Sequence, residues 1–269
     1  MDRPIAPAAP VLLFDSGVGG LTVLEEVRKA LPQAPIVYVA DTAGLPYGNK
    51  TEAQIAARVA GLLGRLTERL QPRLVCIACN TASTIALGMV RDVLEVPIVG
   101  TVPAIKPAAA LTRSGVIGLL GTEATVRQGY VDRLEAEFAQ GKLLLRHAAP
   151  GLVEEAEAKL RGNPIDAGVI RAAVASLRAM PGGDRIDTVV LACTHFPLLE
   201  IELASEFGSG VRLVHGAEGI ARQVARLLEG QPFARARPDY ALTTSSILSS
   251  GSYAHSLQRY GILGGAIEI

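Results

Sequence analysis

The sequence lacks the features that most large binding surfaces need. It contains no tryptophan and is only 4% aromatic, so few rings are available to stack on bases or sugars. Its 26 basic and 26 acidic residues cancel, which gives no excess charge for a nucleic acid or another charged partner. No apolar segment approaches the roughly 20 residues that span a bilayer. We therefore expect no nucleic-acid and no membrane partner, which leaves a small-molecule ligand open.

Cysteine is also scarce, with three residues at positions 76, 79 and 193. Three cysteines do not form a disulfide framework. Residues 1–10 contain one basic residue and three prolines among three alanines, and they lack the apolar core of a signal peptide. These observations favour a reduced, cytoplasmic protein.

What the sequence does contain is a regular alternation of short apolar runs and amphipathic stretches, within a chain that is 49% hydrophobic. The runs are apolar on both faces, as parallel strands covered by helices are. A capping box of Thr51 and Gln54 predicts one helix start, and Thr125 predicts another. The predicted strands are residues 11–14, 36–40, 74–78, 97–100, 116–120, 143–147, 188–192 and 211–214. This pattern predicts an α/β fold with ligand sites at the carboxyl ends of the strands.

The chain also repeats one pattern in two halves. In each half a strand leads to a small hydroxyl-bearing loop, at Asp15-Ser16-Gly17 and at Gly121-Thr122. A later strand then leads to Ala-Cys and a threonine, at 78–81 and at 192–194. We therefore expect two similar α/β lobes with mostly parallel sheets, related by pseudo-twofold symmetry, with the active site in the cleft between them. The predicted first lobe is residues 1–99 plus 215–269, and the second is residues 100–214.

Cys79 and Cys193 each follow a predicted strand and precede a predicted helix start. That position directs a side chain toward a ligand, and a nearby helix N-terminus lowers the pKa of a thiol. Buried cysteine is also a common core residue. Two cysteines at equivalent places favour a function, whereas Cys76 lies inside its strand and is expected in the core.

A metal or redox site is the alternative use of these cysteines. Cys76 and Cys79 form a C-x-x-C pair, and with Cys193 and His195 they offer four zinc ligands. Residues three apart on a strand face opposite sides, which argues against shared coordination. A redox pair normally opens a helix instead of lying within a strand. We therefore expect no metal.

Three further segments allow either a structural or a functional interpretation. Residues 15–20 are expected to form a turn before a helix at 21–30, and the free N–H groups of this turn suit a carboxylate or a phosphate. Asp15 either orients a base or only caps the helix. Pro46-Tyr47-Gly48-Asn49 is an ordinary turn or a loop that covers a ligand. His195 is a partner of Cys193 or a capped loop histidine.

Two thiols on opposite sides of a ligand suit inversion of a carbon centre. One thiolate removes a proton and the opposing thiol delivers another, whereas a single base tends to return the proton to the face it came from. The five lysines include no obvious Schiff-base motif, so we expect no cofactor. Neutral donors that could hold substrate carboxylates are Ser16, Asn80, Thr81, Thr122 and Thr194.

Four segments resemble the glutamate racemase family, within the cofactor-independent aspartate/glutamate racemase superfamily. They read FDSGVGGLTVL, ADTAGLPYGNKT, ACNTAS and LACTHFPLL, and the resemblance extends from Phe14 to at least His215. It implies an isomerase that interconverts L- and D-glutamate and supplies D-glutamate for peptidoglycan. It also implies a homodimer. The rivals are another racemase of the superfamily, such as one for aspartate, and a non-catalytic zinc or redox protein.

The resemblance also implies roles for individual residues. Cys79 takes the proton from D-glutamate and Cys193 takes it from L-glutamate. The supporting acids and histidine fall on Asp15, His195 and Glu154, although Glu155 is adjacent to the last of these. The substrate contacts implied are Asp15, Ser16, Tyr47, Gly48, Asn80, Thr81, Thr194 and His195.

Overall fold

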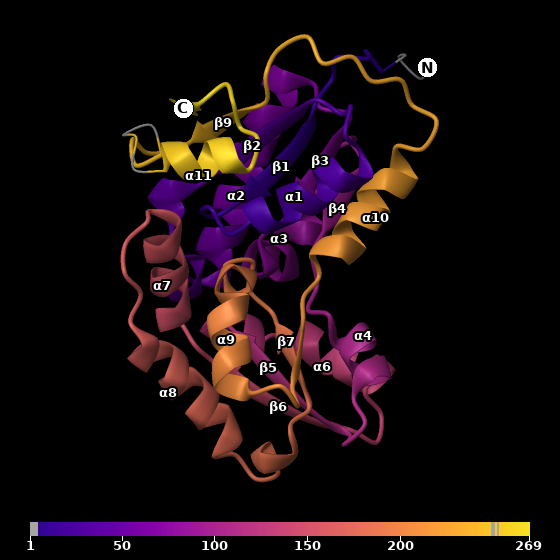
Figure 1. The fold of residues 1–269 in the computed structure, drawn as a ribbon. Coiled ribbons are helices and arrows are strands. Elements are labelled where there is room, and N and C mark those ends of the chain that lie inside the picture. Colours follow the sequence, from indigo (N-terminus) through magenta and orange to yellow (C-terminus); the bar gives the residue numbers. More distant parts are fainter. Residues whose placement is uncertain (1–4, 249–250, 252) are drawn as a thin grey trace. The chain divides into compact units, whose positions relative to one another are not determined.

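Two parallel β-sheets form the framework of the protein (Figure 1). The computed structural model describes residues 5–248, 251 and 253–269. Contacts within the chain divide it into two units, one made of residues up to Thr101 with Ala217–Ile269, and the other of Val102–Gly216. Each unit contains one sheet and the helices that cover it.

The sheet of the first unit has the strand order β10-β9-β2-β1-β3-β4, and its recorded pairings are all parallel. Its strands are β1 (Val11–Asp15), β2 (Ile36–Ala40), β3 (Leu74–Ile77), β4 (Ile98–Gly100), β9 (Tyr240–Thr243) and β10 (Ala266–Glu268). Its helices are α1 (Leu21–Ala30), η1 (Thr42–Gly44), η2 (Tyr47–Asn49), α2 (Glu52–Leu70), α3 (Asn80–Val93), α10 (Ala217–Leu227) and α11 (Ala254–Arg259). Strands β1, β2 and β3 are buried along their whole length, so helices must cover both faces.

Two pairs of helices supply that cover. Helices α1 and α10 pack against each other, as do α2 and α3. Leu12, Phe14, Val75 and Ile77 point from the sheet into a core cluster with the buried residues of α2 and α3. Successive side chains of a strand alternate between faces, so their neighbours in the sequence belong to the opposite layer.

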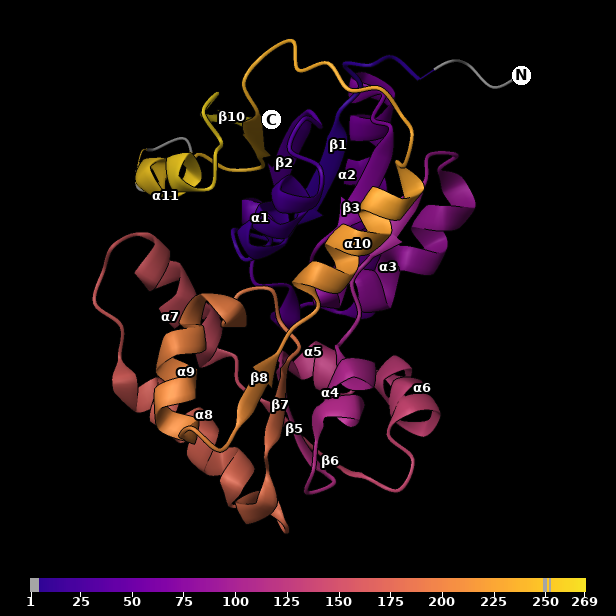
Figure 2. The ribbon, with the colours of Figure 1, turned by 45° about the vertical axis from the view of Figure 1, so that its right-hand side comes forward.

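The second unit repeats this plan on a smaller scale. Its sheet has the order β6-β5-β7-β8, again with parallel pairings. The strands are β5 (Val116–Gly121), β6 (Leu143–Ala148), β7 (Thr188–Leu191) and β8 (Arg212–Val214). The helices are α4 (Ile105–Leu111), α5 (Glu123–Val126), α6 (Gly129–Phe138), α7 (Gly151–Leu160), α8 (Ala167–Arg178), η3 (Gly183–Arg185), η4 (Phe196–Leu199) and α9 (Glu200–Phe207). Figure 2 shows α4 and α6 on one side of this sheet and α7, α8 and α9 on the other, which matches two separate core clusters.

The expected α/β fold with mostly parallel sheets is confirmed, and the eight predicted strands are present with ends that agree to within one residue. The capping box at Thr51 and Gln54 is also present. The helix start at Thr125 is wrong: Thr122 caps the short α5, and α6 begins only at Gly129. Strands β9 and β10 were not predicted. The expected lobe boundaries, at 99/100 and 214/215, lie close to the division by contacts at 101/102 and 216/217.

Both sheets share one topological feature. In each, the first strand is central, the second lies on one side and the third on the other, so the chain reverses its direction of winding between the first and third strands. Ligands of open parallel sheets bind at the carboxyl ends of such a pair. The pairs are β1 with β3 and β5 with β7. Among the described residues, no helix combines the length and the apolar character needed to cross a membrane.

We predict that Gly64→Ala stabilises the protein. Gly64 lies inside α2, and a Cβ there would meet no atom within 4 Å. Alanine is the better helix former, so the free energy of unfolding in urea should rise by about 0.5–1 kcal/mol. Gly20→Ala is the contrasting variant and should lower the stability, because its Cβ would lie only 2.9 Å from Asp15 Cβ and 3.0 Å from the Tyr38 hydroxyl. Loss of stability in the Gly64 variant would contradict this account of α2.

Candidate active site

The first thiol of the site, Cys79, lies where β3 leaves the central strand. The N–H of Ala78 still donates to the Phe14 carbonyl at 2.8 Å, and Cys79 follows as the N-cap of α3. The Cys79 sulfur accepts the N–H of Ala82 at 3.4 Å and lies 3.5 Å from the hydroxyl of Ser16. The side chain is almost fully buried. Helix dipole and local donors therefore favour negative charge on this sulfur.

The second thiol, Cys193, occupies the equivalent place in the other unit. The N–H of Ala192 donates to the Leu120 carbonyl at 2.7 Å, and Cys193 comes next. Here the chain enters the 3₁₀ helix η4, with the N–H of Phe196 donating to the Cys193 carbonyl. The Cys193 sulfur lies 3.9 Å from Nδ1 of His195. The prediction of a strand-end position is thus met for both cysteines, but their immediate neighbours differ.

His195 is buried and is held from both sides. Its Nε2 lies 2.8 Å from Oε1 of Glu157, and its Nδ1 faces the Cys193 sulfur. Burial disfavours the imidazolium, but the hydrogen bonds with Cys193 and Glu157 outweigh it and raise the pKa of His195 well above its usual value. The outer oxygen of Glu157 lies 3.7 Å from the Arg161 guanidinium. This chain of contacts places a positive charge beside the Cys193 sulfur.

The carboxylate that contacts His195 belongs to Glu157, whereas the family resemblance implied Glu154 as the supporting acid. Both residues are on α7, but Glu154 is exposed and Glu157 is buried beside Ala156 and Val153. Glu155 accepts a backbone N–H from the residue before α8. The sequence did carry a signal for Glu157. Residues 153, 156 and 157 lie on the same face of an amphipathic helix, so the acid at 157 falls on the apolar face. A direct part for Glu154 in the reaction stays a prediction.

Asp15 holds the loop that follows β1. Its Oδ2 accepts the N–H of Gly20 at 2.9 Å and that of Gly17 at 3.4 Å. The Tyr38 hydroxyl fixes the same loop by donating to the Gly17 carbonyl at 2.8 Å. These bonds fix the conformation of the loop, and the loop places Ser16 beside Cys79. The same bonds hold the loop before α1, whose N-cap is Gly20, and the service of Asp15 to a base stays a prediction.

A buried charge cluster holds the loop that contains Tyr47. The Tyr47 hydroxyl donates to Asp41 at 2.6 Å, Thr244 donates to the other Asp41 oxygen at 2.6 Å, and Arg58 of α2 forms a two-pronged ion pair with the same carboxylate. Burial opposes ionisation of Asp41, but the bonds from Arg58, Thr244 and Tyr47 prevail and lower its pKa. Burial and the Asp41 charge raise the pKa of Tyr47, which keeps the phenol protonated as a donor. Sequence reasoning missed this cluster.

The remaining predicted residues lie at the same carboxyl edges. Asn80 Oδ1 accepts the Thr101 hydroxyl at 3.3 Å, and Thr122 caps α5 through the N–H of Thr125 at 3.2 Å. The first unit contains Asp15, Ser16, Tyr47, Gly48, Cys79, Asn80 and Thr81. The second contains Thr122, Glu154, Cys193, Thr194 and His195. Apart from Gly48 and Glu154, all of these are buried.

Cys76 differs from the two strand-end cysteines. It is fully buried inside β3, paired with Leu13 and Val99 of the neighbouring strands, and burial raises the pKa of its thiol to about 12. Such a thiol stays protonated and unreactive at neutral pH. Cys76 points to the face opposite Val75 and Ile77. Within the described part of the chain, no three His, Cys, Asp or Glu side chains gather in a way that could hold a metal ion.

We predict that Glu157→Gln lowers the pKa of His195, whereas Glu154→Gln leaves it unchanged. The Glu157 carboxylate is one of the two groups that keep the imidazole protonated against the cost of burial. Without it the imidazolium gives way to neutral imidazole at a lower pH. NMR titration of the ring, with isotope-labelled histidine, measures this directly. An equal effect of the two substitutions would show that Glu157 is not the partner that sets the charge.

Comparison with known proteins agrees with this architecture. A sequence profile of the Asp/Glu/hydantoin racemase family matches residues 21–224. The glutamate racemase of Sphingopyxis alaskensis is 63% identical over 267 residues, which cover 99% of each chain. That of Salmonella typhimurium is 42% identical over 260 residues, covering 96% of this chain and 91% of the relative.

Solved structures give the same result. The Escherichia coli glutamate racemase, crystallised with L-glutamate and the activator UDP-MurNAc-ala, is 40% identical, with a TM-score of 0.89 and 97% of each chain covered. The Thermus thermophilus enzyme, in complex with β-chloro-D-alanine, is 31% identical, with a TM-score of 0.77 and coverage of 98% and 97%. The chain therefore belongs to the Asp/Glu/hydantoin racemase family and is an isomerase.

Proposed function

We propose that this protein interconverts L- and D-glutamate without a cofactor, using Cys79 and Cys193 as two acid–base groups on opposite faces of the α-carbon. The observation that carries the proposal is the equivalence of the two thiols. The first three strands of each unit have the same order in their sheet, and each cysteine follows the third of them. In both units the cysteine comes directly after the residue that makes the last hydrogen bond to the central strand. The proposal requires both units to contribute to one substrate site.

The relatives support glutamate as the substrate. The curated relatives that are 63% and 42% identical are glutamate racemases. The Escherichia coli relative was crystallised with L-glutamate, and the Thermus thermophilus relative with a D-amino-acid analogue. An L-amino acid and a D-amino acid thus each bind to a relative that is at least 31% identical to this chain.

The reaction needs one thiolate and one thiol at the start. With L-glutamate bound, the Cys193 thiolate takes the α-proton, so an S–H bond forms as the C–H bond breaks. The Cys79 thiol gives its proton to the opposite face, so a C–H bond forms and Cys79 becomes the thiolate. No atom is gained or lost, and the product is D-glutamate. Starting from D-glutamate, the same two steps run with the roles exchanged.

The two thiols are prepared by different means. Cys193 lies beside a histidine whose pKa is raised, so the imidazolium stabilises the thiolate by direct charge attraction. Cys79 lies at the N-terminus of the fourteen-residue helix α3, next to the Ser16 hydroxyl, and relies on dipoles and neutral donors. Buried donors at Asn80, Thr81 and Thr194 would hold the substrate carboxylates, whose charge must be balanced as the α-carbon becomes anionic.

The place of this reaction in the cell is part of the proposal. D-Glutamate made in the cytoplasm would supply peptidoglycan synthesis, and the enzyme would act as a homodimer. Aspartate is the competing substrate to test, because the matched family also includes aspartate racemases by its description.

We predict racemisation of L-glutamate by the metal-free, pyridoxal-phosphate-free protein, and little or none of L-aspartate. Circular dichroism or chiral chromatography follows the reaction. Cys79→Ser and Cys193→Ser should each lower kcat at least about 10²-fold, on the scale of general acid–base catalysis. Cys76→Ala is the matched control and should retain most of the activity. Loss of activity to a chelator with recovery on adding zinc, or a folded Cys76→Ala protein as inactive as Cys79→Ser, would overturn the proposal.

We also predict a specific labelling pattern in D₂O. When protiated L-glutamate is converted for a short time, Cys79 carries a solvent deuteron and delivers it to the face opposite the one that Cys193 attacks. The D-glutamate formed should therefore carry deuterium at Cα, while the remaining L-glutamate stays protiated. Mass spectrometry after chiral separation reads both pools, and the mirror experiment begins from D-glutamate. Early product that keeps protium, or substrate labelled as fast as product forms, would indicate a single base.

A further inference from the structure

We propose that Arg58 of α2 and Thr244, which follows β9, are positioning residues of the active site: through the Asp41 carboxylate they hold Tyr47 in place beside Cys79. The inference rests on the proposed function, in which Cys79 is one of the two acid–base groups. All five residues belong to the first unit. Neither Arg58 nor Thr244 lies in the four segments that resemble the racemase family.

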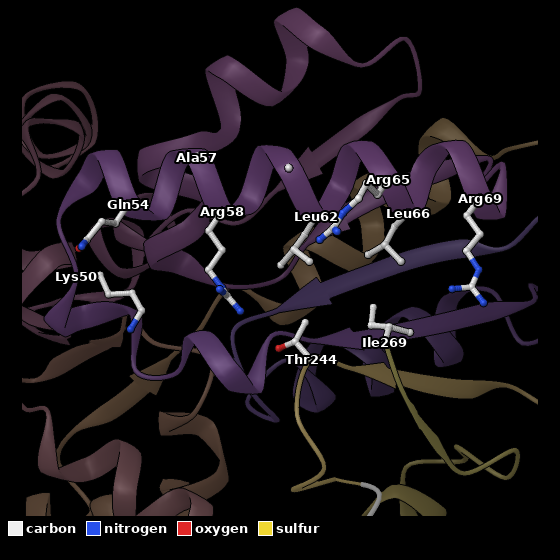
Figure 3. A pocket seen from close by; sticks show the side chains of 11 residues that line it. Lys50, Gln54, Ala57, Arg58, Leu62, Arg65, Leu66, Arg69, Thr244 and Ile269 are labelled. Atoms are coloured by element: carbon white, nitrogen blue, oxygen red, sulfur yellow. The ribbon is translucent and has the colours of Figure 1, made fainter.

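The Asp41 carboxylate is the group that all three partners share. It is fully buried, and Arg58 donates from Nη2 to its Oδ1 at 2.6 Å and from Nε to its Oδ2. Thr244 also donates to Oδ1, and the Tyr47 hydroxyl donates to Oδ2, both at 2.6 Å. Figure 3 shows Arg58 extending from α2 toward Thr244. Because a buried carboxylate requires its donors, Arg58 and Thr244 set the direction in which it faces the Tyr47 hydroxyl.

The backbone of residues 42–49 closes on the same group. A Cβ at Gly44 would lie only 2.7 Å from Arg58 Nε, so the chain approaches the guanidinium as closely as a glycine permits. The N–H of Ala43 donates to the Thr244 hydroxyl at 3.0 Å. The segment is therefore tied to α2 at one point and to the end of β9 at another.

Tyr47 connects this cluster to the thiol. Its side chain is buried in the same core cluster as Cys79 and Ala82, and η2 packs on α3. Burial is the main cause of the raised pKa of Tyr47, followed by the charge and hydrogen bond of Asp41, and the charge of Cys79 adds to these. Tyr47 thus helps to keep water from the Cys79 sulfur, and exclusion of water strengthens the electrostatic interactions of a thiolate.

A matched ion pair lies at the opposite end of β2. Asp41 follows the carboxyl end of this strand, whereas Asp239 accepts the N–H of Ile36, its first residue, at 2.9 Å. Asp239 is also buried, and it pairs with Arg28 of α1 at 2.8 Å. Each pair joins a buried aspartate to a partly exposed arginine of a covering helix. The variant R28Q therefore removes the same kind of interaction at the edge of the sheet away from Cys79.

Hydrogen exchange followed by mass spectrometry tests the positioning without using activity. In R58Q, the amides of residues 42–50 should exchange at least about tenfold faster than in the parent, because exchange reports local opening. T244V removes one donor and keeps the shape of the side chain, so it should speed exchange there at least about threefold. R28Q should stay within about twofold of the parent in this segment. Parent-like exchange of the segment in R58Q, or equal acceleration in R28Q, would overturn the proposal.

Steady-state kinetics tests the link to racemisation. R58Q should raise KM for glutamate at least about tenfold with a smaller change in kcat, since Tyr47 and Gly48 are proposed substrate contacts and such contacts act throughout the reaction. R58K keeps the charge and should recover at least about threefold of that loss. R28Q should keep the parent KM. Because Arg58 acts through Tyr47, R58Q/Y47F should be no worse than the poorer single variant, and additive losses would contradict this route.

The two measurements separate the positioning from the proposed function. If the parent does not racemise glutamate, hydrogen exchange still decides whether Arg58 and Thr244 hold Tyr47. If the parent is active and R58Q exchanges like the parent, the proposed function stands and the positioning is refuted. Should R58Q not fold, R58K and T244V supply the comparison, and both must show faster exchange at residues 42–50 for the proposal to hold.

Discussion

The constraint on which the site depends is the last hydrogen bond between two parallel strands. In one unit the N–H of Ala78 donates to Phe14, and in the other the N–H of Ala192 donates to Leu120. Beyond that bond the third strand is released from its neighbour and the chain leaves the sheet, while the side chain of the next residue still packs in the buried core cluster of its unit. Cysteine occupies this next position both times. The register of a buried sheet is strongly specified, since a shift by one residue would turn every apolar side chain to the other face.

The same register gives two thiols of one short segment very different surroundings. Cys76 and Cys79 are only three residues apart, yet Cys76 is enclosed between two neighbouring strands with a pKa raised to about 12. Cys79 begins a helix and contacts a hydroxyl and a backbone N–H. In the second unit the neighbour of the sulfur is a histidine instead, and the carboxylate of Glu157 keeps its ring charged. Equal positions in the fold thus carry unequal electrostatic environments.

The sequence was sufficient to predict those features that depend on neighbours in the chain. Strands such as Ile36–Ala40 are apolar on both faces, and the thiols directly follow two of them. Strand β10 (Ala266–Glu268) was missed because it has three residues and is mostly exposed, so it carries no buried periodic pattern. Glu157 was missed because it is distinguished from Glu154 only by the helix face on which it lies. The cluster around Asp41 was missed because Thr244 is about two hundred positions away in the chain, and only the pairing of β9 with β2 brings it there.

That cluster shows why long-range contacts matter for a site built from short loops. The Asp41 carboxylate is fully buried, and a buried charge is tolerated only when donors replace the water that it has lost. Tyr47, Arg58 and Thr244 supply those donors from a 3₁₀ turn, a long helix and the end of a strand that was not predicted. Removing any one of them would leave the charge incompletely satisfied, which is more costly than losing a surface ion pair. The position of Tyr47, in a segment that has only two short 3₁₀ turns of its own, therefore depends on three elements that share one carboxylate.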